Sequence, residues 1–183
     1  MKNAAKLRKA IDSVLYELWV LRTSGPPVWE EDLIESNRRV ETMVLHARVL
    51  RDFFFVNPNL PVNATDIVAT DFFANAKKDW PHTRGNLPPY LAKNKTRMDR
   101  ALAHLSYDRE KWTGRDKIWD SAPIFAEIGD KWFEFLDRLS ASNEPAFAWI
   151  QSHTNTAMGR VPLRPPFEDP SGEESEVESS SSM

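Results

Sequence analysis

The stretch from Trp29 to Val56 contains neither glycine nor proline, and its apolar residues recur at the three- and four-residue spacing of a helix. Glycine and proline are the residues that most often interrupt or end helices, so the stretch predicts one long helix, straight or kinked. Its second half also carries Leu45, Val49, Phe53 and Phe55 outside the main stripe. A helix that is apolar almost all round is covered by its neighbours, so we expect this one to be the central helix of a bundle.

Further helices are expected on both sides of this stretch. Each shows helical apolar spacing and is bounded by glycine, proline or a capping residue. They are predicted near 4–23, over 65–73 with a cap near Asn63 or Thr65, from Pro88 or Pro89 to about 111, from Ser121 onward, and after Pro145, with an irregular connection over 76–88. No segment has the two-residue period of a strand and no internal repeat appears. The sequence therefore predicts an all-α fold, a single bundle of about five or six helices.

The chain changes character near residue 160. The formal net charge is −3, yet the residues after Arg164 include six acidic and no basic side chains, so the rest of the chain is mildly basic at +3. We expect a helical domain over 1–159 and a disordered tail over 160–183, which is rich in proline, serine and glutamate.

The same composition suggests a cytoplasmic protein. The apolar segment that follows the basic start is interrupted by Asp12 and Glu17, and no run of about 18 uncharged apolar residues exists to span a membrane. The chain has no cysteine, which excludes disulfides, thiol nucleophiles and cysteine-ligated metals. No histidine and carboxylate spacing typical of a metal site and no glycine-rich phosphate loop is present, so neither a metal nor another cofactor is expected.

The chain contains seven tryptophans, which could form a stacking platform for bases or sugars or could pack in the core. Four of them fall within or beside the apolar stripes of predicted helices, namely Trp19, Trp119, Trp132 and Trp149. We therefore predict that these four tryptophans serve core packing.

A stripe of charges lies along one edge of the central helix. At 100° per residue, Glu41, Arg48 and Asp52 fall within about 60° of each other. One interpretation is a structural network in which Arg48 pairs with Asp52 and another helix satisfies Glu41. The other is a ligand or catalytic pocket at this edge, to which Asp71 would contribute. His46 lies about 140° from Glu41, so we expect it to pack against a different neighbour.

Several motifs resemble those of a group of uncharacterised bacterial helical proteins. The motifs are Glu41-x-x-x-Leu45-His46-Ala47-Arg48-x-Leu50-x-Asp52-Phe53-Phe54, then Asp66-x-x-Ala69-x-Asp71-Phe72-Phe73, then Ala103-His104-Leu105-Ser106-Tyr107-x-Arg109. The resemblance spans about residues 36 to 110. It implies a helical fold and a role for these positions, but no particular activity.

A broader resemblance is to the HEPN superfamily of nucleotide-binding helical bundles, in which many RNases carry an arginine and, four to six residues later, a histidine. Arg97 and His104 have the six-residue form of this spacing. The resemblance implies that His104 would assist attack by a 2′-hydroxyl and Arg97 would bind the phosphate, usually across a dimer interface. Arg100, one helical turn before His104, is the closer intrahelical partner.

Residues 77 to 100 form the most basic stretch, which could bind a phosphate backbone or be an ordinary solvated surface. Three functions therefore stay open: a HEPN-like metal-independent RNase or RNA-binding relative, a non-catalytic module that binds a protein or a second copy of itself, and a small-ligand-binding bundle.

Overall fold

The computed structural model describes residues 4–25, 33–55, 66–101 and 119–154. These residues form six α-helices, two short 3-10 helices and no β-strand, which confirms the prediction of an all-α bundle for this part of the chain. The elements are α1 (Ala4–Ser24), α2 (Leu33–Phe54), η1 (Ala69–Phe72), α3 (Ala76–Asp79), η2 (Arg84–Asn86), α4 (Pro89–Ala101), α5 (Ser121–Ala141) and α6 (Pro145–Thr154). The expected tail over 160–183 and the expected continuation of α4 to residue 111 lie outside the described residues.

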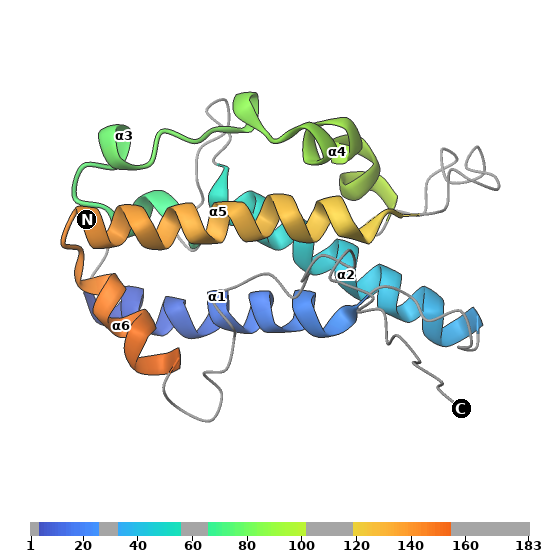
Figure 1. Ribbon diagram of the computed structural model, residues 1–183, viewed down its shortest axis with the longest axis horizontal. Helices are drawn as coiled ribbons and strands as arrows, with labels where there is room; N and C mark the ends of the chain where they lie inside the picture. Colours follow the sequence, from blue (N-terminus) through green and yellow to red (C-terminus); the bar gives the residue numbers. More distant parts are fainter. Residues whose placement is uncertain (1–3, 26–32, 56–65, 102–118, 155–183) are drawn as a thin grey trace, which may run out of the picture.

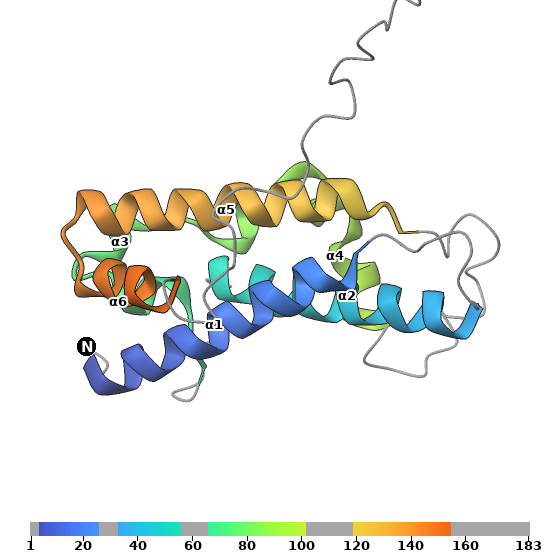
Figure 2. The same ribbon diagram turned by 60° about the horizontal axis from the view of Figure 1, so that its bottom comes forward.

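The long helices α1, α2 and α5 run along the length of the molecule (Figure 1). Figure 2 shows α1 and α2 side by side and antiparallel, with α5 along the opposite side. α2 packs against α1, α4 and α5, and α6 turns back from α5 onto α1. The predicted central helix is thus the helix with the most neighbours among the described elements.

The connection between α2 and α4 differs from its prediction. The short helix expected over 65–73 is a single 3-10 turn, η1, because the Asp71 carboxylate folds back to accept a hydrogen bond from the backbone N–H of Val68. The segment expected to be irregular over 76–88 contains α3 and η2. Turns this short leave almost no periodicity in a sequence, since they are fixed by local hydrogen bonds.

The core is built around aromatic rings from α2, η1 and α5. Phe135 of α5 is fully buried, and its ring lies 5.5 Å from the rings of both Phe53 and Trp80 and 5.7 Å from those of Phe72 and Phe73. Most of these pairs meet edge to face, the arrangement that aromatic quadrupoles prefer. The rings connect α2, η1 and the residue after α3 to α5 in one continuous core.

Two predictions of burial are wrong. Trp132 is buried, and Trp119 and Trp149 pack partly against the core, but Trp19 is half exposed on α1. On α2, Leu45 and Val49 are also exposed, so this helix is not covered all round. The helix stripe that includes Met43, Leu50 and Phe54 is enough to fill the space between its neighbours.

α4 and α5 are joined at the N-terminus of α4. The two carboxylate oxygens of Glu127 on α5 accept hydrogen bonds from the backbone N–H groups of Tyr90 and Leu91, at 2.8 and 2.9 Å. These groups lie in the first turn of α4, where N–H groups have no partner within the helix and negative charge is favoured. The N-terminus of α4 is therefore capped from a different helix.

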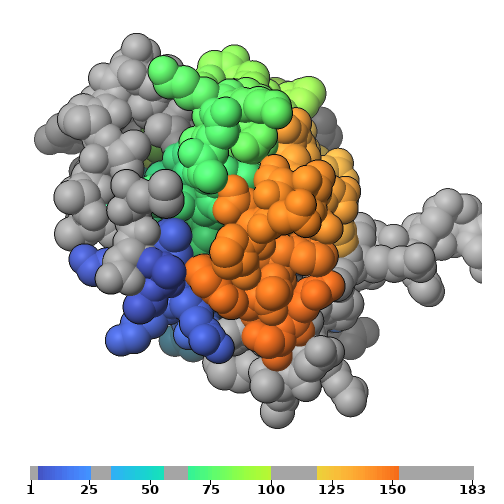
Figure 3. Space-filling view, turned by 90° about the vertical axis from the view of Figure 1, so that its left-hand side faces the viewer, coloured from blue at the N-terminus to red at the C-terminus, as the bar shows by residue number. Residues whose placement is uncertain are grey.

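The turn between α5 and α6 is held to the segment that leads into α3. Figure 3 shows the chain around this turn, in orange, beside the segment that leads into α3, in green. The Glu144 carboxylate accepts a hydrogen bond of 2.7 Å from the backbone N–H of Ala74.

Among the described helices, none combines the length and the apolar character that crossing a membrane requires.

Candidate functional site

Five charged side chains from three elements meet where α2, η2 and α4 come together. We call them the arginine cluster: Arg48, Arg51 and Asp52 on α2, Arg84 on η2, and Asp99 on α4. The Oδ1 atom of Asp52 accepts from Arg51 Nε (2.9 Å), Arg51 Nη2 (2.8 Å) and Arg84 Nη2 (2.7 Å). Asp99 Oδ1 accepts from Arg51 Nη2 at 2.6 Å and lies 3.4 Å from Arg48 Nε. Three cations and two anions therefore share one network.

Arg51 is the centre of this cluster and is fully buried. Burial lowers the pKa of a guanidinium, but the adjacent Asp52 and Asp99 outweigh that effect and raise the pKa of Arg51 above its ordinary value. Arg51 thus stays charged in the interior. Its Nη1 atom and the Nε atom of Arg84 are also buried, and neither has a hydrogen-bond partner in the described part of the chain.

The expected ion pair between Arg48 and Asp52 is wrong. Arg48 turns to Asp99 on α4, and Asp52 turns to Arg51 and Arg84. The four-residue spacing of Arg48 and Asp52 suggested a pair within one helix, whereas each of them pairs with a residue of another element. Arg51, Arg84 and Asp99 were missed as site residues, and only the placement of Arg51 on the core side of an apolar helix could have indicated its role.

The other candidates on and near α2 lie apart from the arginine cluster. Glu41 is exposed, and Asp71 closes the η1 turn. His46 faces α1, where its Nδ1 atom lies 2.6 Å from Glu17 Oε2 and its ring lies 6.2 Å from that of Tyr16. The structure therefore does not bring Glu41, His46 and Asp71 together in one pocket with Arg48 and Asp52.

Of the two residues implied by the HEPN resemblance and the nearby Arg100, only the side chain of Arg97 is described. Its guanidinium lies over the indole of Trp119, 3.8 Å from the ring centroid. The side chain of Arg100 and all of His104 lie outside the described residues. Asp99 is two residues from Arg97, so it projects about 200° around the helix. Arg97 and the arginine cluster thus occupy different sides of α4.

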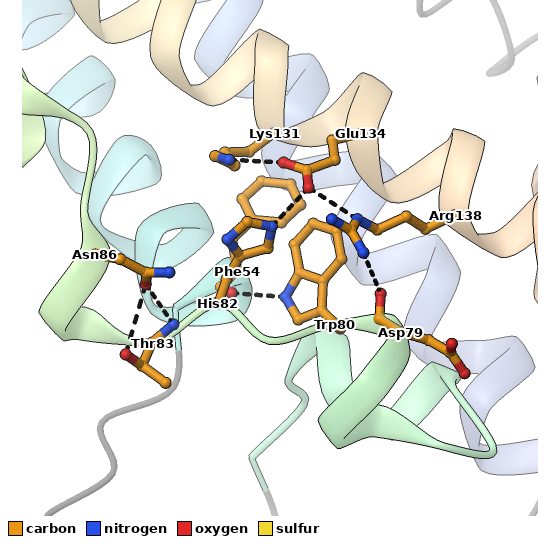
Figure 4. Close-up of polar contacts among 9 residues, drawn as sticks. All are labelled: Phe54, Asp79, Trp80, His82, Thr83, Asn86, Lys131, Glu134 and Arg138. Atoms are coloured by element: carbon orange, nitrogen blue, oxygen red, sulfur yellow. Dashed lines mark hydrogen bonds and ion pairs between the residues drawn. The ribbon is translucent and has the colours of Figure 1, made fainter.

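A second polar cluster, which the sequence did not suggest, lies between α5 and the segment after α3 (Figure 4). We call it the His82 cluster: His82, Lys131, Glu134 and Arg138. Glu134 Oε1 lies 2.7 Å from His82 Nε2 and accepts from Arg138 Nε at 2.8 Å, while Oε2 accepts from Lys131 Nζ at 2.6 Å. The His82 ring packs edge to face against Trp80, with centroids 4.5 Å apart.

The His82 cluster makes the stability of the fold depend on pH. Burial raises the pKa of Glu134, but hydrogen bonds from Lys131, His82 and Arg138 outweigh it and lower the pKa to about 2 from 4.5. The carboxylate of the folded protein therefore stabilises the fold above pH 4.5, and this contribution is lost as the pH falls toward 2. We expect Glu134→Gln to cost about 2 to 3 kcal/mol at neutral pH and to flatten the loss of stability in acid.

Urea unfolding of the wild type and Glu134→Gln between pH 6 and pH 2.5 measures this effect. Asp130→Asn, which changes an exposed carboxylate on the same helix, is the matched control and should parallel the wild type. Parallel curves for the wild type and Glu134→Gln would show that the carboxylate is not held by its three partners.

The outward side of the α1 and α2 pair carries exposed apolar side chains. We call it the α1–α2 face: Tyr16 and Trp19 on α1, and Leu45 and Val49 on α2, each between 42% and 51% exposed. The rings of Tyr16 and Trp19 lie 6.4 Å apart, and Tyr16 meets His46, which is one helical turn from Val49. Each helix therefore carries an exposed apolar pair, and Tyr16 of α1 contacts His46 of α2.

Within the described ranges, no group of three or more histidine and acidic side chains is arranged to hold a metal ion. Comparisons with protein-family models, with curated proteins and with solved structures find no match for this chain. The family relationships that the sequence motifs suggest therefore remain predictions.

Proposed function

We propose that this helical domain is a non-catalytic interaction module that associates through the α1–α2 face. The observation that carries the proposal is the gathering of Tyr16, Trp19, Leu45 and Val49, all exposed, on two adjacent helices. Large apolar side chains scattered singly are normal on a surface, but a group of them that includes two aromatic rings is typical of a binding surface. Tyrosine and tryptophan are also the side chains that dominate binding energy at such surfaces.

The charged stripe of α2 supports this reading. In the arginine cluster each carboxylate is already engaged by arginines of the same chain, and Arg97 is stacked on Trp119. Groups held in this way are poorly placed to act as acids or bases. The apolar side chains of the α1–α2 face, in contrast, are half exposed.

The partner that we propose is a second copy of the chain. A two-fold contact places the same surface of both copies against each other, and such homodimers are the commonest soluble oligomers. On the same two helices, Glu17 Oε2 lies 2.6 Å from His46 Nδ1, so this carboxylate is already engaged within one copy. We also propose a cytoplasmic location, because the apolar residues of α1, which follow the basic start of the chain, contribute to the core and to the α1–α2 face.

The test is sedimentation equilibrium over a wide range of protein concentration, with the wild type and the double variant Trp19→Ser, Leu45→Ser. We expect the wild type to dimerise reversibly and the variant to stay monomeric at the highest concentration. Both positions are half exposed, so the variant should keep its helical circular dichroism and most of its stability.

Ile67→Ser is the matched control, because Ile67 is an exposed apolar residue that lies on neither α1 nor α2. It should dimerise like the wild type. A wild type that is monomeric throughout, or a double variant that dimerises equally well, would contradict association through this face.

RNA binding by a HEPN-like domain is the second candidate function. It is supported by the exposed side chains of Lys77 and Lys78 on α3 and Lys93 on α4, which lie on elements that follow the same side of the bundle in Figure 1. A row of cations can bind a phosphate backbone without reading its sequence. In this candidate, Arg97, Arg100 and His104 would carry the metal-independent RNase activity of a bacterial HEPN-like protein.

The wild type and His104→Ala incubated in EDTA with structured and single-stranded RNA test the RNase form. Cleavage by the wild type alone would support catalysis by His104. Equal, background-level cleavage by the wild type and by His104→Ala would contradict the RNase hypothesis. Filter binding at increasing salt tests RNA binding separately, because an affinity that depends on phosphate contacts falls steeply with salt concentration.

A further inference from the structure

The arginine cluster has more positive charge and more hydrogen-bond donors than its own residues use. Three guanidinium groups meet two carboxylates, and the Oδ1 atom of each carboxylate accepts every contact. The Nη1 atom of Arg51 and the Nε atom of Arg84 remain buried and without a hydrogen-bond partner among the described residues. An unpaired donor on a buried cation destabilises the fold, because the group has lost its hydrogen bonds to water without forming new ones.

These two unpaired donors belong to neighbouring guanidinium groups. Arg51 and Arg84 both donate to the same oxygen atom of Asp52, so their guanidinium groups are neighbours. The Asp52 carboxylate lies between these two cations, and its single negative charge leaves one positive charge in excess. A negatively charged acceptor is therefore favoured as the partner of an unpaired donor here.

We propose that the arginine cluster binds a phosphate group, with oxygens that accept hydrogen bonds from Arg51 Nη1 and Arg84 Nε. Phosphate matches the planar, forked donors of arginine, and it can carry more negative charge than a carboxylate. It would also balance the extra positive charge of the cluster.

The site is built on rigid elements and has an open side. Arg51 is fixed by Asp52 and Asp99 from two helices, so its donors are already oriented before a ligand arrives. The side chains of Arg84 and Arg48 are 22% and 31% exposed, so a phosphate would enter from their side, with Arg84 moving to admit it. Within the described residues, Arg48 is held by a contact of 3.4 Å to Asp99 and could turn toward a bound phosphate.

The phosphate could belong to a free or monoester phosphate or to the backbone of RNA. Inorganic phosphate, adenosine monophosphate and a short single-stranded RNA without terminal phosphates are therefore titrated separately by calorimetry into the full-length protein at constant chloride. The ligand that binds most tightly identifies the source. Nitrogen-edited spectra of the arginine Nε–H groups report whether Arg84 is the group that responds.

Arg84→Gln and Arg48→Gln are the test variants, since both residues are partly exposed and neither substitution removes the buried charge. We expect each to weaken phosphate binding by about tenfold or more. Arg138→Gln is the matched control, because Arg138 is also a partly exposed, ion-paired arginine but lies in the His82 cluster, and it should bind like the wild type. Absence of saturable binding by all three ligands would overturn the proposal, as would an equal loss in Arg138→Gln.

Discussion

Replacing Arg51 by alanine should lower the free energy of unfolding by about 3 to 4 kcal/mol. Arg51 is among the largest fully buried side chains, and it is the residue that connects Asp52 on α2 with Asp99 on α4. Its removal leaves two carboxylates without their shared cation and opens a cavity between the helices. Urea unfolding followed by circular dichroism at neutral pH measures the loss.

Two further variants separate charge from volume at this position. Arg51→Met refills most of the space without the charge, and a well-packed apolar side chain often replaces a buried ion pair at little cost, so it should recover most of the stability. Arg48→Ala removes a partly exposed arginine whose ion pair to Asp99 is 3.4 Å long, and it should cost less than about 1 kcal/mol. If Arg51→Ala were no more harmful than Arg48→Ala, the cluster would not contribute to holding α2 and α4 together.

The second large effect is expected at Phe135. Phe135→Ala should cost about 3 to 5 kcal/mol, because the ring is fully buried and touches aromatic rings from three other segments. For a chain of this length such a loss corresponds to about 10 °C in the melting temperature. Since Trp132 stacks against Phe135 and Trp80 meets it edge to face, tryptophan fluorescence should also report the change.

Phe135→Leu and Phe147→Ala are the controls for this prediction. Leucine keeps most of the volume and should cost less than about 1.5 kcal/mol. Phe147 on α6 is only partly buried at the edge of the core, so its removal should cost about 1 kcal/mol. Equal losses at Phe135 and Phe147 would mean that the aromatic cluster is not the centre of the core.

The helices could be predicted because each leaves a long periodic pattern that ends at a proline, a glycine or a capping residue. α5 is an example, with Asp120 accepting from the N–H of Ala122 at its start and buried residues from Ile124 to Leu139. The exposure of Trp19 could not be predicted in the same way. Its apolar character fits a helical stripe, but which stripes are covered depends on how many neighbours a helix has, and this is a property of the whole fold.

The candidate sites were harder to predict than the helices. Arg48 and Asp52 were identified, but their partners Asp99 and Arg84 lie 51 and 32 residues away in sequence from them. The His82 cluster was missed for the same reason, since Glu134 follows His82 by 52 residues. Side chains that pair within one helix have a recognisable spacing, whereas pairs between helices depend on packing that no local pattern records.

The cap that Glu127 provides for α4 has a consequence for the order in which the chain folds. The described part of α4 spans 13 residues, and the N–H groups of its first turn have no acceptor within the helix. During synthesis α4 is made before α5, so the amides of Tyr90 and Leu91 have no acceptor until residue 127 has emerged and docked. The first turn of α4 should therefore gain protection from hydrogen exchange together with α5, and these two helices should form one cooperative unit of folding.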